Sequence, residues 1–218
     1  MSRETGAGRL DEGRPSATAQ SVARRRASHA LRDHPPVLDD PFAVAIIGAE
    51  AADKLKREVG QGDENAWDRA MRAFMAMRSR LAEDRLAVGY DAGVRQYVVL
   101  GAGLDTYGCR NARPDLKVFE IDHPSTQAWK RGRLRECGIE TAPGLVFVPV
   151  DFARQALGLA AQESGGLSLD GITEPHMIVG RQLAGGEVVI EVTQLTKQLA
   201  SAIVVRSVGP QPQAAVRS

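Results

Sequence analysis

Hydrophobic positions change their spacing part-way along the chain, and the change separates a helical region from a region of strands. Over residues 65–88 apolar side chains recur three and four positions apart, which predicts a long helix with one apolar face. Residues 16–34 are rich in alanine on a basic background and predict another helix. Two prolines end it, and Asp40 and Pro41 then suit the cap and first turn of a third helix that runs to about residue 59.

Three continuous apolar runs of strand length follow, at residues 96–100, 116–121 and 145–150. Helical stretches at residues 105–112 and 124–137 separate them. The order strand, helix, strand, helix, strand is typical of a parallel sheet with crossover connections. Such α/β sheets bind ligands at the carboxyl ends of their strands. We therefore expect an α/β fold whose site lies where these strands end.

The net charge, the cysteines and the histidines argue against several kinds of ligand and partner. The formal net charge is +1, so no strong field favours binding to nucleic acid. The two cysteines lack CxxC spacing, and His29, His34 and His176 lack metal-ligand spacing, so we expect no metal site. With so few cysteines a disulfide framework is also not expected, which fits a reducing compartment. The apolar patch at residues 42–47 is far too short to span a bilayer. These features predict a soluble cytoplasmic protein with no nucleic-acid or membrane partner.

The first strand runs into the sequence LGAGLDT, a glycine-rich turn. Gly101 and Gly103 let a ligand approach the backbone closely. The dinucleotide fingerprint G-x-G-x-x-G needs a third glycine where Thr106 stands, and the next glycine, Gly108, comes two residues late. The displaced glycine argues against a pyrophosphate-bearing ligand such as NAD.

Acidic residues end the next two strands. Asp122 follows the glycines at about the separation at which an acid holds a ribose hydroxyl, and Asp151 ends the third strand. Three consecutive strand ends therefore carry glycines, an acid and an acid, a set that suits an adenosine ligand without a pyrophosphate, S-adenosylmethionine. Taken singly, each feature has a structural alternative: a tight turn for the glycines and a helix cap for each acid.

Residues 16 to about 158 resemble the leucine carboxyl methyltransferase family, most closely its large bacterial branch, which is abundant in actinobacteria. The matching stretches are VARRRASHAL…LDDPFA, MRSRLAEDRL, RQYVVLGAGLDTYGCR, VFEIDHPSTQAWKRGRL and VPVDFARQAL. The resemblance implies a Rossmann-like class I methyltransferase fold with an N-terminal helical cap and S-adenosyl-L-methionine as the cofactor. It also implies methyl transfer to an oxygen, carboxyl or hydroxyl, of an unknown substrate.

The resemblance assigns cofactor contacts residue by residue. Its implied contacts are Gly101 and Gly103 at the methionine moiety, Asp122 at the ribose, and Asp151 with Phe152 beside the adenine. An arginine that pairs with the methionine carboxylate falls on Arg78, with Arg80 as the alternative, and a guanidinium fork suits a carboxylate physically. Arg26, one of three adjacent arginines, is a candidate for a further basic residue near the cofactor. For Arg78 and Arg80 the structural alternative is a solvated helix face.

Methyl transfer asks little of protein side chains, because the sulfonium already activates the methyl group. The protein must align a nucleophile behind it and exclude water. A carboxylate acceptor on a small molecule or other substrate needs no base, whereas a hydroxyl needs one. His123 is the nearest histidine in sequence, but it lies beside the ribose acid, so we interpret it as structural. The catalytic residue is left unassigned.

The C-terminal third departs from the family, since no Phe, Trp or Tyr follows Phe152. Residues 187–192 and 202–206 are predicted strands, and residues 193–200 a short helix. These are few elements for the rest of the family's sheet, so we expect its C-terminal part to be incomplete, through truncation, or rearranged. An incomplete sheet exposes an edge, which predicts either marginal stability or a homo-oligomer.

The expected organisation has four parts: a flexible tail (1–15), a helical region (16–95), a βαβαβ cofactor-binding core (96–158) and a divergent segment (159–218). The function expected is that of an S-adenosylmethionine-dependent methyltransferase. Two alternatives stay open: an inactive relative that only binds the cofactor or a partner, and an NAD-dependent oxidoreductase.

Overall fold

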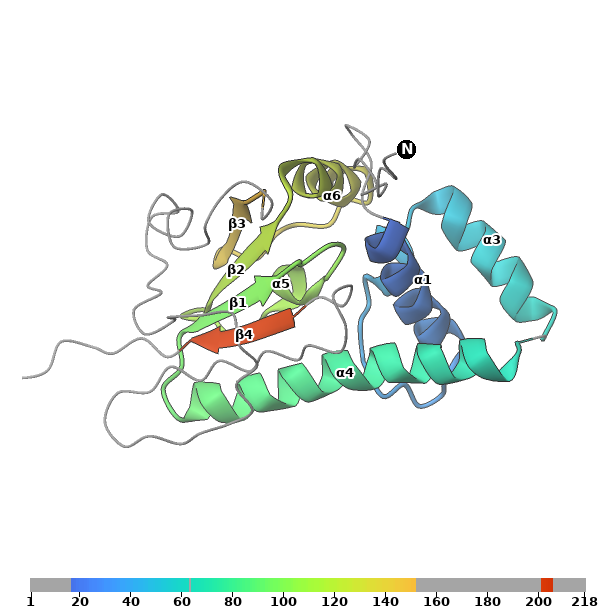
Figure 1. Ribbon diagram of the computed structural model, residues 1–218, viewed down its shortest axis with the longest axis horizontal. Helices are drawn as coiled ribbons and strands as arrows, with labels where there is room; N and C mark the ends of the chain where they lie inside the picture. The colour runs from blue at the N-terminus through green and yellow to red at the C-terminus, as the bar shows by residue number, and fades with distance from the viewer. Residues whose placement is uncertain (1–16, 63, 152–200, 206–218) are drawn as a thin grey trace, which may run out of the picture.

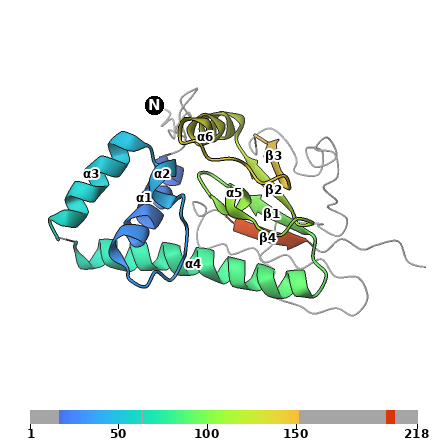
Figure 2. The same ribbon diagram turned by 180° about the vertical axis from the view of Figure 1, so that it is seen from behind.

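The computed structural model describes residues 17–62, 64–151 and 201–205. A four-stranded sheet lies beside a group of helices, and the longest helix passes along both (Figure 1). The helices are α1 (Ala17–Arg32), α2 (Ala43–Ile46), α3 (Ala49–Gly60), α4 (Ala66–Asp91), α5 (Tyr107–Arg110) and α6 (Pro124–Glu136). The strands are β1 (Gln96–Leu100), β2 (Lys117–Asp122), β3 (Leu145–Pro149) and β4 (Ser201–Val205). Figure 2 shows the molecule from behind, with α2 beside α1.

The sheet has the strand order β3-β2-β1-β4. β1 pairs with β2 in parallel, with Val98 opposite Phe119, and β2 pairs with β3 in parallel. This confirms the expected α/β arrangement of parallel strands for the first three strands. β4 pairs with β1 in the antiparallel sense and overlaps the strand predicted at residues 202–206. The strand predicted at residues 187–192 and the helix at 193–200 lie outside the described residues.

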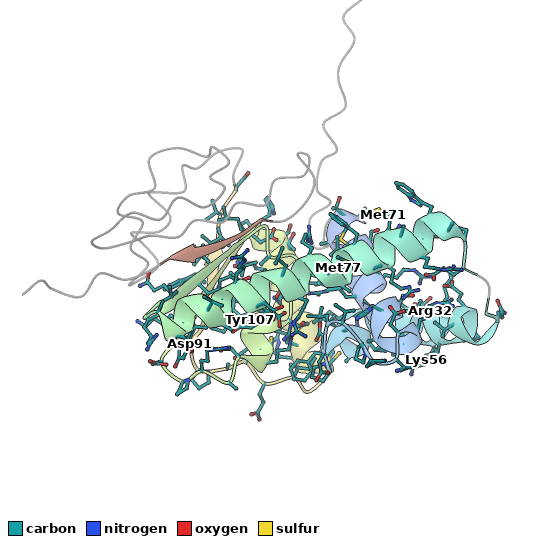
Figure 3. All side chains as sticks on the ribbon, turned by 90° about the horizontal axis from the view of Figure 1, so that it is seen from below. Arg32, Lys56, Met71, Met77, Asp91 and Tyr107 are labelled. Carbon is teal, nitrogen blue, oxygen red and sulfur yellow. The ribbon has the colours of Figure 1, made fainter. Side chains whose placement is uncertain are left out.

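The long helix predicted at residues 65–88 is confirmed as α4. Asn65 caps its start, because its side-chain oxygen accepts a hydrogen bond from the backbone N–H of Asp68 at 2.9 Å. Gly93, with φ 98°, follows its end and lets the chain turn into β1. Seen from below, α4 crosses both parts of the molecule (Figure 3). Neither α4 nor any other helix in the described ranges has the length and apolar character needed to cross a bilayer.

Among the described residues, apolar clusters hold these elements together. One lies between α1 and its neighbouring helices, where Ala23 and Ala27 are fully buried and let the helices approach closely. Another joins α4 to the sheet through Leu86, Tyr97 and Val118. Leu86 is fully buried, which contributes roughly 1.5–3 kcal/mol to stability. The helical region and the sheet are therefore joined along α4.

One helix prediction is wrong. The segment expected to form a single helix from Pro41 to about Val59 forms two helices, α2 and α3, which are separated at Gly48. Gly48 has φ 89° and ψ 157°, a combination that is essentially restricted to glycine. A Cβ atom there would lie 2.1 Å from the Arg133 guanidinium of α6. The positive-φ conformation of Gly48, beside the Arg133 side chain, thus separates the two helices.

Replacing Gly48 with alanine is expected to lower the free energy of unfolding by about 1–3 kcal/mol, because the added side chain strains this backbone conformation. Chemical denaturation of the full chain measures the change. Gly132→Ala is the control, since Gly132 lies inside α6 with open space where a Cβ would project. That substitution should stabilise the chain by roughly 0.5–1 kcal/mol. Equal stability of Gly48→Ala and the unsubstituted chain would show that the break tolerates a side chain.

Candidate functional site

The turn after β1, residues 101–104, is called the glycine turn below. Gly101 has φ 61° and Gly103 has φ 53°, both in the left-handed region that favours glycine. The backbone N–H of Gly101 donates to the carbonyl oxygen of Ile121 at 2.8 Å, which ties the turn to β2. A Cβ atom on Gly103 would lie 3.1 Å from the Cβ of Ala19, so α1 lies directly against the turn. The glycine turn is therefore framed by β2 on one side and α1 on another.

The carboxylate of Asp122 lies beside the glycine turn. Its Oδ2 accepts a hydrogen bond from the backbone N–H of Gly103 at 2.5 Å, and its Oδ1 accepts one from the backbone N–H of His123 at 2.6 Å. The side chain is half-buried at the end of β2. Each ionised carboxylate oxygen has a second lone pair, so Asp122 can accept further hydrogen bonds.

Asp151 lies next to Asp122 at the same edge of the sheet. The backbone N–H of Val150 donates to the carbonyl oxygen of Asp122 at 2.8 Å, which joins the two strand ends. Between the two acids stands His123, whose Nε2 is 4.0 Å from Oδ2 of Asp151. Nδ1 of His123 accepts a hydrogen bond from the backbone N–H of Ser125 and so caps α6, which agrees with a structural role. Phe152, the predicted neighbour of the adenine, lies outside the described residues.

Arg26 anchors α1 to the end of the glycine turn. Its Nη1 donates to Oδ2 of Asp105 at 3.0 Å and its Nη2 donates to the carbonyl oxygen of Leu104 at 2.5 Å. The side chain is 3% exposed. Burial alone would raise the pKa of Asp105, but Arg26 and then Lys130 oppose it strongly enough that the pKa lies below its usual value. Asp105 is therefore ionised at neutral pH and compensates the charge of Arg26.

Arg78 of α4 carries a buried donor with no hydrogen-bond partner among residues 17–62, 64–151 and 201–205, namely Nη1. Burial lowers the pKa of Arg78, Asp105 opposes this shift, and the nearby charge of Arg26 adds to it. Arginine keeps its proton in proteins, so Arg78 is a cation whose Nη1 has a hydrogen bond left to donate, as far as the described residues show. Such a group is suited to an anion entering beside the glycine turn.

Arg80, the alternative to Arg78, lies on the solvent face of α4. It is half exposed, and its Nε donates to Oδ1 of Asp84 at 2.7 Å. Its Nη1 donates to the carbonyl oxygen of Val37 at 3.2 Å. Arg78, the residue chosen from the resemblance, and its alternative Arg80 thus have different surroundings: the charge of Arg78 interacts with Asp105, whereas Arg80 is paired with Asp84.

Two contacts near the glycine turn were not predicted from the sequence. Thr106 Oγ1 donates to Oδ2 of Asp40 at 2.6 Å, and both side chains are buried. Arg110 forms an ion pair with Glu83 of α4 through both terminal nitrogens. Burial raises the pKa of Glu83, and Arg110 opposes that shift. No local pattern indicates either contact, because the partners are far apart in the sequence.

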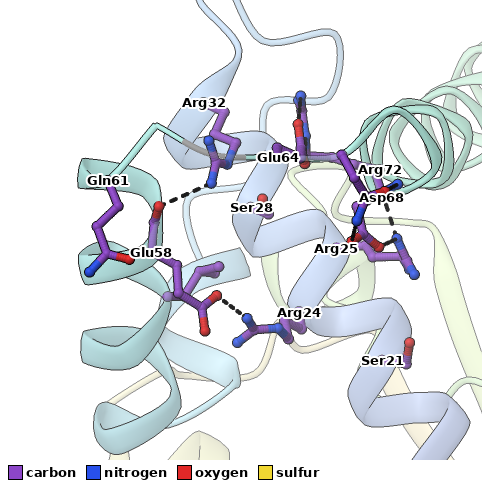
Figure 4. A pocket seen from close by; sticks show the side chains of 12 residues that line it. Ser21, Arg24, Arg25, Ser28, Arg32, Glu58, Gln61, Glu64, Asp68 and Arg72 are labelled. Atoms are coloured by element: carbon purple, nitrogen blue, oxygen red, sulfur yellow. Dashed lines mark hydrogen bonds and ion pairs between the residues drawn. The ribbon is translucent and has the colours of Figure 1, made fainter.

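A polar cavity of about 310 Å³ lies between α1, α3 and α4 (Figure 4). Its wall contains arginines that are paired with carboxylates: Arg24 with Glu58, Arg25 with Asp68, and Arg72 with Glu64. A fourth arginine, Arg32, donates to the carbonyl oxygen of Glu58 at 3.3 Å. The glycine turn and the strand-end acids do not line it. Its charges are largely compensated within the wall, so the strand-end site remains the better candidate.

Comparison with known sequences identifies the family. The sequence model described as leucine carboxyl methyltransferase matches residues 19–167. The chain belongs to the leucine carboxyl methyltransferase family. This confirms the resemblance predicted from LGAGLDT and the segments around it. The glycine turn and the acids at the ends of β2 and β3 all lie inside the matched range.

Relatives of this leucine carboxyl methyltransferase family member occur in mycobacteria. A protein of Mycobacterium marinum is 38% identical over 151 residues, which cover 64% of this chain and 47% of the relative. One from Mycobacterium tuberculosis H37Ra is 36% identical over 161 residues, 68% of this chain and 50% of the relative. Both carry the name "Putative S-adenosyl-L-methionine-dependent methyltransferase". The chain thus spans about half the length of the curated relatives it matches.

Proposed function

We propose that the chain binds S-adenosyl-L-methionine at the carboxyl ends of β1, β2 and β3 and serves in methyl transfer to a carboxyl or hydroxyl oxygen. The observation that carries the proposal is the buried Nη1 of Arg78, which has no hydrogen-bond partner among the described residues and whose charge interacts favourably with Asp105, the residue after the glycine turn. Family membership and the names of the mycobacterial relatives support the same cofactor. The acceptor, a small molecule or another carboxyl-bearing substrate, is part of the proposal.

The residues at the site fit this cofactor. The guanidinium of Arg78 would hold the methionine carboxylate, and the open backbone of the glycine turn lets the methionine moiety lie close to it. Asp122 would accept hydrogen bonds from the ribose hydroxyls with the acceptor capacity that its backbone contacts leave over. Asp151, with Phe152, would lie beside the adenine.

The chemistry of the bound cofactor is that of a methyl group on a sulfonium, already activated for displacement. The residues of the chain would hold and orient the cofactor and the acceptor, and would exclude water from them. Arg26 keeps α1 against the glycine turn, and α1 would thereby cover that side of the site against water. A carboxylate acceptor is nucleophilic without a base, and we assign no catalytic residue.

Calorimetry on the full chain tests the choice of cofactor. S-adenosylhomocysteine, the stable demethylated product, should bind, and NAD should not, because Thr106 fills the place of the glycine that would pack under a pyrophosphate. Binding of NAD without binding of S-adenosylhomocysteine would overturn the proposal.

The same titration with Asp122→Ala locates the site. Loss of the carboxylate should weaken S-adenosylhomocysteine binding by about 1.5–3 kcal/mol for each charge-assisted hydrogen bond to the ribose. Asp115→Ala is the control, since Asp115 lies before the other end of β2 and binds Tyr90 and Arg95 at the surface. Equal affinity of a folded Asp122→Ala chain and the unsubstituted chain would leave Asp122 with a structural role only.

A further inference from the structure

Thr106 stands where a dinucleotide fingerprint has its third glycine, and its side chain contacts the helical region instead. Oγ1 of Thr106 donates to Oδ2 of Asp40 at 2.6 Å. Thr106 is fully buried and Asp40 is 5% exposed, so water does not compete for this hydrogen bond. A glycine at this position would leave the buried Asp40 carboxylate without one of its donors.

The carboxylate of Asp40 has two further neighbours, the backbone of Phe42 and the side chain of Arg110. Its Oδ1 accepts a hydrogen bond from the backbone N–H of Phe42 at 3.1 Å and lies 3.7 Å from Nε of Arg110. Arg110 in turn forms the two-pronged ion pair with Glu83 of α4. The carboxylate of Asp40 therefore joins the segment before α2 to the start of α5 and, through Arg110, to α4.

The glycine turn depends on anchors outside itself. Gly101 and Gly103 have no side chains that could fix the path of the backbone. Thr106 follows the turn closely and is bound to Asp40, while Arg26 binds Asp105 and the carbonyl oxygen of Leu104. The segment from 104 to 106 is thus tied to the helical region by two separate contacts.

We propose that Asp40 and Thr106 are positioning residues whose hydrogen bond fixes the glycine turn against the helical region at the spacing that cofactor binding requires. The effect on cofactor affinity rests on the proposed function. Thr106 precedes α5 but makes no side-chain cap hydrogen bond, so its hydroxyl does not serve that helix. Without the contact the turn gains conformational freedom, which a ligand must remove when it binds, and affinity falls.

Two substitutions at position 106 separate the hydroxyl from the shape of the side chain. Thr106→Val keeps the shape and removes the hydroxyl, whereas Thr106→Ser keeps the hydroxyl. In calorimetry Thr106→Val should weaken S-adenosylhomocysteine binding roughly tenfold or more, a range typical of coupling between two sites. Thr106→Ser should bind nearly as the unsubstituted chain does.

Hydrogen exchange of the ligand-free full chain gives a readout that does not depend on the cofactor. The backbone N–H groups of Gly103 and Asp105 donate to Asp122 and to the carbonyl oxygen of Ala102, so their exchange reports the order of the turn. Both should exchange faster in Thr106→Val. Glu64→Gln is the control, because it weakens a partly buried ion pair of the helical region, with Arg72, away from the turn. It should lower stability without changing affinity or exchange at Gly103.

Unchanged affinity and unchanged exchange in a folded Thr106→Val chain would overturn the inference, as would an equal loss in Thr106→Ser. If Thr106→Val does not fold, Asp40→Asn, which keeps the size of the side chain and weakens the bond, is measured in the same two ways. Failure of the unsubstituted chain to bind S-adenosylhomocysteine would overturn the proposed function instead. The rate of hydrogen exchange at Gly103 would then be the remaining test of whether the hydrogen bond between Asp40 and Thr106 orders the glycine turn.

Discussion

Replacing Arg78 with methionine is expected to weaken S-adenosylhomocysteine binding by about 2–5 kcal/mol, the cost of truncating one partner of a buried charge pair. That loss is a factor of roughly 30 or more in the dissociation constant. Stability should stay unchanged or rise slightly, because the substitution removes a partly buried charge whose Nη1 has no hydrogen-bond partner within the described residues. Calorimetry and chemical denaturation on the same samples measure the two quantities.

Arg80→Met is the matched control for this prediction. It removes an arginine from the same helix, but one that is half exposed and paired with Asp84. An exposed ion pair is screened by solvent and contributes little to stability, and we expect no change in cofactor affinity. A folded Arg78→Met chain with unchanged affinity would exclude Arg78 from the cofactor site. A large loss of stability would show instead that its charge is compensated in the folded chain.

Replacing Lys130 with methionine is expected to destabilise the fold by about 3–5 kcal/mol. Lys130 of α6 forms an ion pair with Glu120 in β2, and each side chain is only 1% exposed. The substitution keeps an apolar side chain of similar length and leaves Glu120 as a buried charge without its partner. Oε1 of Glu120 already has no hydrogen-bond partner in the described parts of the chain, so no other group there takes the place of Lys130.

The destabilisation should depend on pH in a defined direction. Burial raises the pKa of Glu120 above its ordinary 4.5, although Lys130 opposes the shift, and removing Lys130 raises it further. Above pH 4.5 the folded chain then binds more protons than the unfolded chain, so stability falls as pH rises through this range. The loss caused by Lys130→Met should therefore be largest at neutral pH and shrink as pH falls toward 4.5.

The double variant Glu120→Gln with Lys130→Met is the control, since it removes both charges. It should recover most of the stability at neutral pH and lack the added pH dependence. Denaturation at several pH values measures both effects. A loss in Lys130→Met that is the same at every pH would attribute the effect to packing against Phe147, whose ring centroid lies 5.7 Å from Nζ, rather than to charge.

The parts of the fold that the sequence predicted well are those set by local apolar pattern. β1 occupies the predicted residues 96–100, and β2 begins and ends one residue later than predicted. Strands buried on both faces read as continuous apolar runs, so their limits are visible in the sequence. The break at Gly48 was missed because a single glycine inside a helical pattern does not by itself show where a helix ends.

The residues of the candidate site likewise fall into those that a local pattern indicates and those that depend on contacts between distant parts of the chain. The glycines and acids could be proposed because each follows directly from a strand end, whereas Arg78 was preferred to Arg80 only through the family resemblance. The side chains of residues two positions apart on a helix differ in direction by about 200° around the helix axis. The spacing of apolar residues does not say which of the two sides of α4 faces the glycine turn. The hydrogen bond between Asp40 and Thr106 joins side chains 66 positions apart and has no local signature.

The continuity of α4 has a consequence for engineering the chain. This helix of 26 residues packs against α1 and also contributes Leu86 to the core beside the sheet, and Arg78 lies on the same rigid element. Inserting one residue before Arg78 would rotate everything upstream by about 100° relative to the sheet and lengthen the helix by about 1.5 Å. Grafts of the helical region onto another sheet must therefore keep the helical phase across α4, so that insertions of about 7 or 11 residues are the ones that preserve it.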